Sequence, residues 1–178
     1  MAVKESATRK ARWRSLLLLG VGLIVVALIS VIWYRQHYAM EVARSFEVAG
    51  SPAGPRVLIA TQGSDFKDAL TAGLVDHLQR RSAFVKVIDV TALESVQEAD
   101  WNAMVVIHTW EMRKPPIEVG AFVDRIRGRD KLVVLTTSGA GNFKLEGLDA
   151  ISAASQMDNV TARVDELASR IDAVLDTQ

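Results

Sequence analysis

Residues 56–66 constrain the fold of this chain more than any other stretch, because an apolar strand runs directly into a polar turn and a helix. Four apolar residues that favour β-structure lie between Pro55 and Gly63, which is typical of a buried strand. After the turn, an apolar residue recurs at every fourth position and marks one helix face: Phe66, Leu70, Leu74 and Leu78. Ligands of open parallel sheets bind beyond the carboxyl ends of the strands. The sequence therefore predicts that any site includes the turn.

The same alternation of strands and helices continues to the C-terminus. Further strands are predicted at residues 84–90, 103–108 and 132–137, with a weaker one at 149–154. Helices are predicted at residues 66–81, 91–99, after Pro115, and after a cap at Asp158 or Asn159. Such spacing forms right-handed βαβ units. We therefore predict an α/β fold with a five-stranded parallel sheet in the order 2-1-3-4-5 and helices on both faces.

This strand order brings the carboxyl ends of strands one, three and four together. The loops that follow them are residues 61–66, 109–114 and 138–142. We expect these three loops to converge on one edge of the sheet, where a ligand would bind.

A run of nineteen residues from Leu16 to Tyr34 carries no charge. At about 1.5 Å per residue it spans about 28 Å, close to the hydrocarbon thickness of a bilayer. Trp13 precedes the run and Trp33 with Tyr34 ends it, where aromatic rings favour the headgroup layer. This predicts a transmembrane helix that contacts the lipid bilayer from Leu16 to Tyr34. A cleaved signal peptide is the alternative, although its apolar core of about 7–15 residues is shorter and no clear cleavage site precedes Trp33.

The charged residues on either side of the predicted span indicate its orientation in the membrane. Five basic residues precede the span, whereas only Arg35 and Arg44 follow within the same reach. By the positive-inside bias, tail 1–15 is cytoplasmic and the domain is periplasmic or extracellular, on a single-pass protein of the inner or plasma membrane.

Residues 50–55 are rich in glycine and proline. We therefore predict a linker at 35–55 and one domain at 56–178.

Composition excludes several classes of function. Of the 21 basic and 21 acidic residues, five basic and one acidic lie before the end of the span, which leaves 16 and 20 beyond it. This mildly acidic domain argues against nucleic-acid binding. The chain has no cysteine, so disulfides, thiolate metal sites and cysteine nucleophiles are excluded. The three histidines are scattered, and no metal site is predicted.

From about Arg56 to the C-terminus the chain resembles the flavodoxin-like family, including its protoporphyrinogen-oxidase branch. The resemblance depends on the first strand and its polar loop, on Thr109-Trp110 ahead of Pro115-Pro116, and on the glycine loop after strand four. It implies an FMN cofactor bound by three loops. The phosphate would lie among Thr61, Gln62, Gly63, Ser64, Asp65 and Phe66. The isoalloxazine would contact Thr109 and Trp110 on one side and Ser138, Gly139, Ala140, Gly141 and Asn142 at its edge.

The phosphate loop departs from the family pattern Ser/Thr-x-Thr-Gly-x-Thr. In an ungapped match only Thr61 agrees in kind, so two hydroxyl donors are missing. Asp65 also places a carboxylate at a helix N-terminus, where it could cap the helix and repel a phosphate unless Lys67 or an arginine offsets its charge.

Three functions therefore remain open. The first is a membrane-anchored FMN domain that exchanges electrons with a quinone or a membrane protein. The second is a cofactor-free interaction or assembly module, in which Trp110 packs on a partner or covers the core. The third is a hydrolase using Ser64 or Ser138 with His108 and Asp65, although neither serine lies in a nucleophile elbow. A receiver domain is disfavoured, because strand three ends in His108 where an aspartate is expected.

Overall fold

The structure is a computed structural model of the chain, and it describes residues 2–38, 41–110, 114–138 and 150–177. The chain divides into two compact units, Met1–Ala39 and Met40–Gln178.

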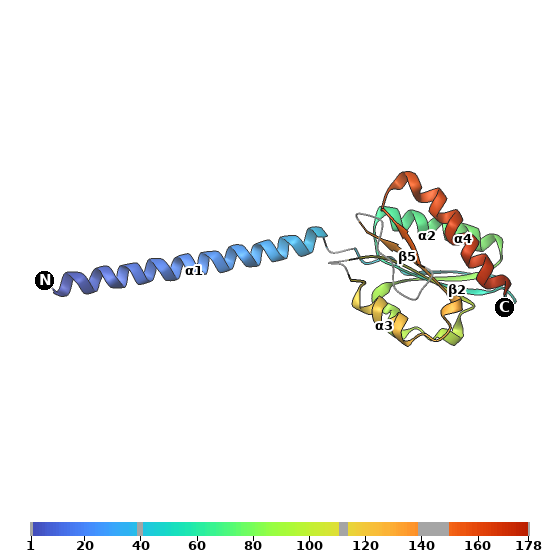
Figure 1. Cartoon of the computed structure of the whole chain (residues 1–178), viewed down its shortest axis with the longest axis horizontal. Helices are drawn as coiled ribbons and strands as arrows, with labels where there is room; N and C mark the ends of the chain where they lie inside the picture. Colours follow the sequence, from blue (N-terminus) through green and yellow to red (C-terminus); the bar gives the residue numbers. More distant parts are fainter. Residues whose placement is uncertain (1, 39–40, 111–113, 139–149, 178) are drawn as a thin grey trace. The chain divides into compact units, whose positions relative to one another are not determined.

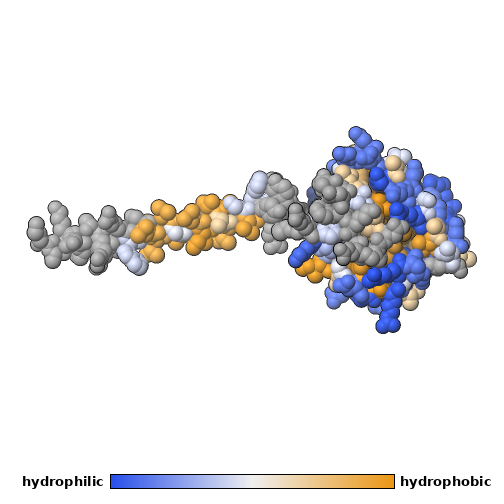
Figure 2. All heavy atoms as spheres, viewed as in Figure 1, coloured by the Kyte–Doolittle hydropathy of each residue, from blue (hydrophilic) through white to orange (hydrophobic). Residues whose placement is uncertain are grey.

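The first unit is a single helix, α1, at Ala2–Tyr38 (Figure 1). Within it, Leu16–Trp33 forms a stretch of 18 residues that is long and apolar enough to cross a membrane, and none of this stretch is buried inside the protein. Figure 2 shows the band of apolar side chains along this part of the helix. One such helix near the N-terminus agrees with the predicted anchor, while the orientation and the final location stay predictions.

The second unit is built on a six-stranded sheet in the order β1-β3-β2-β4-β5-β6. Its strands are β1 Phe46–Val48, β2 Arg56–Thr61, β3 Phe84–Asp89, β4 Ala103–Thr109, β5 Leu132–Thr137 and β6 Ala150–Ala153. The strands from β2 to β6 pair in parallel, whereas β1 runs antiparallel along β3.

The predicted five-stranded parallel sheet is therefore wrong in the number of strands, and the order of the whole sheet differs. The additional strand β1 lies in the predicted linker and covers the edge of β3, with the ammonium of Lys86 2.8 Å from the carboxylate of Glu47. Three residues around Glu47 are too few to give a strand signal by alternation. The five parallel strands alone, β3-β2-β4-β5-β6, lie in the relative order that was predicted for them.

Two apolar layers cover the faces of the sheet because side chains alternate along each strand. Val57 and Ile59 of β2 pack under helices α2 Asp65–Arg80 and α4 Val160–Asp176. The intervening Leu58 and Ala60 pack on the opposite face, against helix α3 Ile117–Arg125 and the 3₁₀ turn Val90–Ser95. Figure 1 shows α2 and α4 on one side of the sheet and α3 on the other.

Two local predictions differ from the structure. The predicted helix at 91–99 is instead two 3₁₀ turns, Val90–Ser95 and Glu98–Asp100, because its apolar stripe is too short to stabilise α-helix. Asn159 occupies the cap position of α4 without a side-chain hydrogen bond to the helix.

Candidate functional site

The carboxyl ends of β2, β4 and β5 meet at one edge of the sheet, which we call the carboxyl edge. Thr61 is paired in register with Ile107, and Thr109 with Thr137. The loops that leave these strands therefore start side by side, as predicted. Seven buried polar side chains gather at this edge: Thr61, Gln62, Lys67, His108, Thr136, Thr137 and Ser138.

The loop between β2 and α2 is only three residues long and is covered by the chain's own backbone. The Gly63 amide donates to the Glu41 carbonyl at 2.6 Å, and the two residues form an isolated antiparallel bridge. A Cβ built on Gly63 would lie 2.7 Å from that carbonyl oxygen and 3.0 Å from the carbonyl carbon. Glycine is therefore needed here because segment 41–43 passes directly over the loop.

Asp89, at the carboxyl end of β3, holds this covering segment in place. One of its carboxylate oxygens accepts from the Ala43 amide at 2.7 Å. The other accepts from the amide and the hydroxyl of Thr91 at 2.9 and 2.7 Å. The carboxylate thus joins the segment that follows α1 to the central sheet.

The start of helix α2 is capped from within the loop. Ser64, not Asp65, is the N-cap: its hydroxyl accepts from the Lys67 amide at 3.3 Å. Asp65 is exposed in the first turn, where its negative charge interacts favourably with the helix dipole. Phe66 is buried in the core. The prediction that Asp65 could cap the helix is wrong, because Ser64 immediately precedes the first helical residue.

A hydrogen-bond network joins the loops after β2 and β4. The Gln62 side-chain oxygen accepts from the Thr109 amide at 2.8 Å, and the Gln62 amide donates to Ile107 at 3.3 Å. The hydroxyls of Thr109 and Thr137 are 2.8 Å apart. The Trp110 amide donates to the Thr137 carbonyl at 2.9 Å. Three of the predicted loop residues, Gln62, Thr109 and Trp110, are therefore held by hydrogen bonds within the protein.

His108 is fully buried beneath this network. Its Nδ1 lies 3.4 Å from the Thr109 carbonyl, and its Nε2 lies 3.1 Å from the Thr136 hydroxyl. Because a carbonyl only accepts, Nδ1 carries the proton and Nε2 accepts from the threonine. Burial lowers the pKa of His108 from 6.5 to about 4; the carbonyl of Thr109 opposes this shift and the charge of Lys67 adds to it. The imidazole is therefore neutral at pH 7.

Lys67 is the residue of the carboxyl edge that sequence reasoning undervalued. Its side chain is 0% exposed although it lies two residues after the exposed Asp65 and directly before the exposed Asp68. Lysine is almost never buried without a partner. Its position, one residue after Phe66 and three residues before Leu70 of the buried α2 face, was the signal in the sequence.

The third loop is only partly described. Ser138 is buried, and its amide donates to the Ala153 carbonyl at 3.2 Å. Gly139, Ala140, Gly141 and Asn142, which were predicted to touch a flavin edge, lie outside the described residues. Their assignment stays a prediction.

Of the two serines predicted for a hydrolase, Ser64 does not pair with His108 in the structure, and the pairing of Ser138 stays a prediction. The hydroxyl of Ser64 caps α2, while the ring nitrogens of His108 face Thr136 and Thr109. Asp65 is exposed in the first turn of α2. Within the described residues, no three histidine, cysteine, aspartate or glutamate side chains are grouped as metal ligands.

The loop after β2 does not fit the phosphate of FMN. A phosphate at a helix N-terminus is bound by free backbone amides, but the Gly63 amide is bonded to Glu41 and the Lys67 amide to Ser64. The hydroxyl of Thr61 is also engaged, by the Gln62 carbonyl at 3.1 Å. The exposed Asp65 carboxylate adds repulsion at the same helix end.

Comparison with known proteins gives only fold-level likenesses. No protein-family model and no curated protein matches the sequence. Similar solved structures include oxidised flavodoxin 2 from Bacillus cereus, with 15% identity and a TM-score of 0.47, covering 66% of this chain and 98% of that one. Another is a flavodoxin from the domain Archaea, with 12% identity and a TM-score of 0.46, covering 67% and 98%.

The apo form of an NADH:FMN oxidoreductase, EmoB, is similar with 15% identity and a TM-score of 0.44, covering 69% of this chain and 89% of that one. These structures are flavodoxin-like folds. The protoporphyrinogen-oxidase branch of the resemblance stays a prediction.

Proposed function

We propose that this chain is a single-pass membrane protein whose flavodoxin-like domain is a cofactor-free interaction module for another membrane protein. The observation that carries the proposal is the hydrogen bond from the Gly63 amide to the Glu41 carbonyl, at 2.6 Å. It closes the position where a flavin phosphate would bind.

Residues of the same chain cover the loop after β2. Segment 41–43 is held from two directions, by Gly63 in the loop and by the Asp89 carboxylate, which accepts from Ala43. Removing the segment would leave the Asp89 carboxylate and the Gly63 amide without these partners, so a phosphate would have to compete with two hydrogen bonds at once.

The carboxyl edge also presents an apolar group to a partner. Ile117 begins α3 directly after the loop that leaves β4, and its side chain is 85% exposed. An exposed aliphatic side chain is ordinary on a surface by itself, but here it lies on the edge that this fold uses for recognition. A partner in the same membrane would meet the tethered domain at a high effective concentration.

Two experiments test this function. The full chain, purified in a mild detergent, is titrated into FMN while flavin fluorescence and anisotropy are followed. We expect no saturable change. One FMN bound per chain with quenched fluorescence would refute the cofactor-free function.

The partner is sought with a photo-cross-linking amino acid placed at Ile117, and the matched control carries it at the exposed Gln79 on α2. In intact cells, we expect one cross-linked membrane protein from position 117 and none from position 79. Equal cross-linking from both positions would contradict a docking edge.

A second candidate function is flavin-dependent electron transfer to a quinone or a membrane partner. The observation that favours it is the convergence of β2, β4 and β5, which places Thr109, Trp110 and Ser138 on the same edge. FMN would supply the redox chemistry, and Trp110 would offer a face for its ring. Binding would require segment 41–43 to leave, so FMN should accelerate hydrogen exchange of the Ala43 amide.

A further inference from the structure

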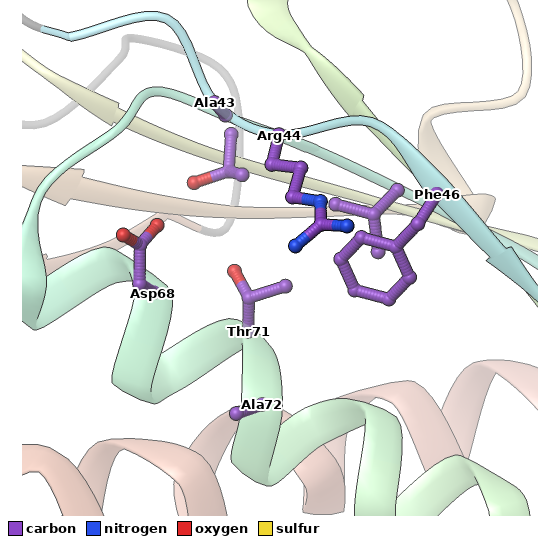
Figure 3. Close-up of a pocket in the computed structure, with 8 residues that line it drawn as sticks. Ala43, Arg44, Phe46, Asp68, Thr71 and Ala72 are labelled. Atoms are coloured by element: carbon purple, nitrogen blue, oxygen red, sulfur yellow. The ribbon is translucent and has the colours of Figure 1, made fainter.

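A cavity of about 240 Å³ lies beside the carboxyl edge, between helix α2 and segment 43–46. It belongs to the side of the sheet that α2 covers, and it shares only Thr61 with the loop residues predicted to hold a flavin. Figure 3 shows side chains of α2 and of segment 43–46 facing each other across it.

The walls of this cavity are mainly apolar. Ala43 and Val87 are buried, and the Phe46 ring, 39% exposed, closes one side. Sites for drug-sized ligands measure about 300–1,000 Å³, so this cavity is suited to a smaller molecule with an aliphatic body.

Thr71 contributes a buried hydroxyl that points into the cavity (Figure 3). The residue is 4% exposed, and among the described residues its Oγ1 has no hydrogen-bond partner. A threonine inside a helix usually bonds to the carbonyl four residues earlier, and buried hydroxyls are rarely left unsatisfied. The Thr71 hydroxyl is thus an unsatisfied donor in the wall of the cavity.

Opposite charges stand on the two walls. Asp68 lies three residues before Thr71 on α2 and so shares its face, while Arg44 extends from the other wall (Figure 3). Within the described part of the chain, neither side chain takes part in an ion pair. A ligand that carries both a positive and a negative group would satisfy both.

We propose that this cavity binds a small apolar α-amino acid, such as leucine. The ligand's carboxylate pairs with the Arg44 guanidinium and accepts from the Thr71 hydroxyl. Its ammonium pairs with the Asp68 carboxylate. Its aliphatic side chain packs on the apolar wall formed by Ala43, Phe46 and Val87. The proposal does not depend on whether the carboxyl edge binds FMN.

Binding is tested on the full chain in detergent by isothermal titration and by the thermal shift of the domain. The probes are leucine, 4-methylpentanoate, which lacks the ammonium, and isoamylamine, which lacks the carboxylate. We expect one leucine per chain and binding about tenfold weaker, or more, for either fragment, because each loses a charged hydrogen bond. Absence of leucine binding, or 4-methylpentanoate binding as tight as leucine, would overturn the proposal.

Three variants assign the contacts. Thr71→Val keeps the shape of the side chain and removes the hydroxyl, so it should fold normally and bind leucine about tenfold more weakly. Asp68→Asn and Arg44→Gln should each weaken leucine binding by a similar or larger factor. Asp76→Asn and Arg80→Gln, at exposed positions of α2 outside the cavity, are the matched controls. Unchanged leucine affinity in all three cavity variants would refute this site.

Discussion

Replacing Gly63 with alanine tests the closure of the loop after β2. The new Cβ would lie 2.7 Å from the Glu41 carbonyl oxygen, 2.9 Å from the Glu41 Cβ and 3.0 Å from its carbonyl carbon. Two of these atoms belong to the backbone, so the steric clash is relieved only if segment 41–43 moves. This movement would weaken the hydrogen bond from the amide of residue 63 to the Glu41 carbonyl. Overpacking of this kind costs about 1–3 kcal/mol.

The matched control is Gly120→Ala in helix α3. Among the described residues, its Cβ would meet only Pro115 Cγ, at 3.9 Å, an ordinary contact. Alanine is a better helix former than glycine by about 0.5–1 kcal/mol, so this variant should be more stable than the wild type.

Thermal unfolding of the full chain in detergent, followed by tryptophan fluorescence, measures both variants. For a domain of this size we expect Gly63→Ala to lower Tm by about 4–12 °C and Gly120→Ala to raise it slightly. Hydrogen exchange should be faster in segment 41–43 of Gly63→Ala and unchanged in Gly120→Ala. A Gly63→Ala variant as stable as the wild type, with unchanged exchange, would refute the covering of the loop by Glu41.

Three further predictions concern the domain. Because the pKa of His108 falls from 6.5 in the unfolded chain to about 4 in the folded one, the unfolded state binds more protons in this window. Neutral His108 therefore contributes about 3 kcal/mol to the free energy of unfolding above pH 6.5, and this contribution is lost as the pH falls to about 4. Denaturant unfolding at several pH values should show this loss of stability, and the His108→Gln variant should not show it. Asp89→Asn should cost about 1–3 kcal/mol in the same assay and speed exchange of the Ala43 amide, since it weakens a charged hydrogen bond of 2.7 Å. Gly73→Ala should destabilise the packing of α2 on α4, because its Cβ would lie 2.7 Å from Val164 Cγ2; a double variant with Val164→Ala should recover most of the loss in Tm.

Local pattern was sufficient for the parallel core of the sheet. The strand predicted between Pro55 and Gly63 is β2 at Arg56–Thr61, and the helix predicted at 66–81 matches α2 at Asp65–Arg80 to within a residue. These elements are specified by the spacing of neighbouring apolar residues, which the sequence displays directly. The apolar run from Leu16 was likewise visible as a helix long enough to span a bilayer.

The candidate site was predicted only in outline. Convergence of the three loops followed from the order of the parallel strands, and Thr109, Trp110 and Ser138 do lie on one edge with Gln62. The residues that cover the carboxyl edge could not be predicted from the sequence. Hydrogen bonds such as that between Gly63 and Glu41 join residues whose separation in the sequence carries no periodic signal.

The sequence by itself determined the five parallel strands and helices α2, α3 and α4, since hydrophobic period and turn residues act over a few positions. Only the tertiary structure decided that β1 borders β3, that Glu41 covers Gly63, and that Lys67 and His108 are buried. Each of these depends on contacts between distant residues, whose energies appear only once the sheet has assembled.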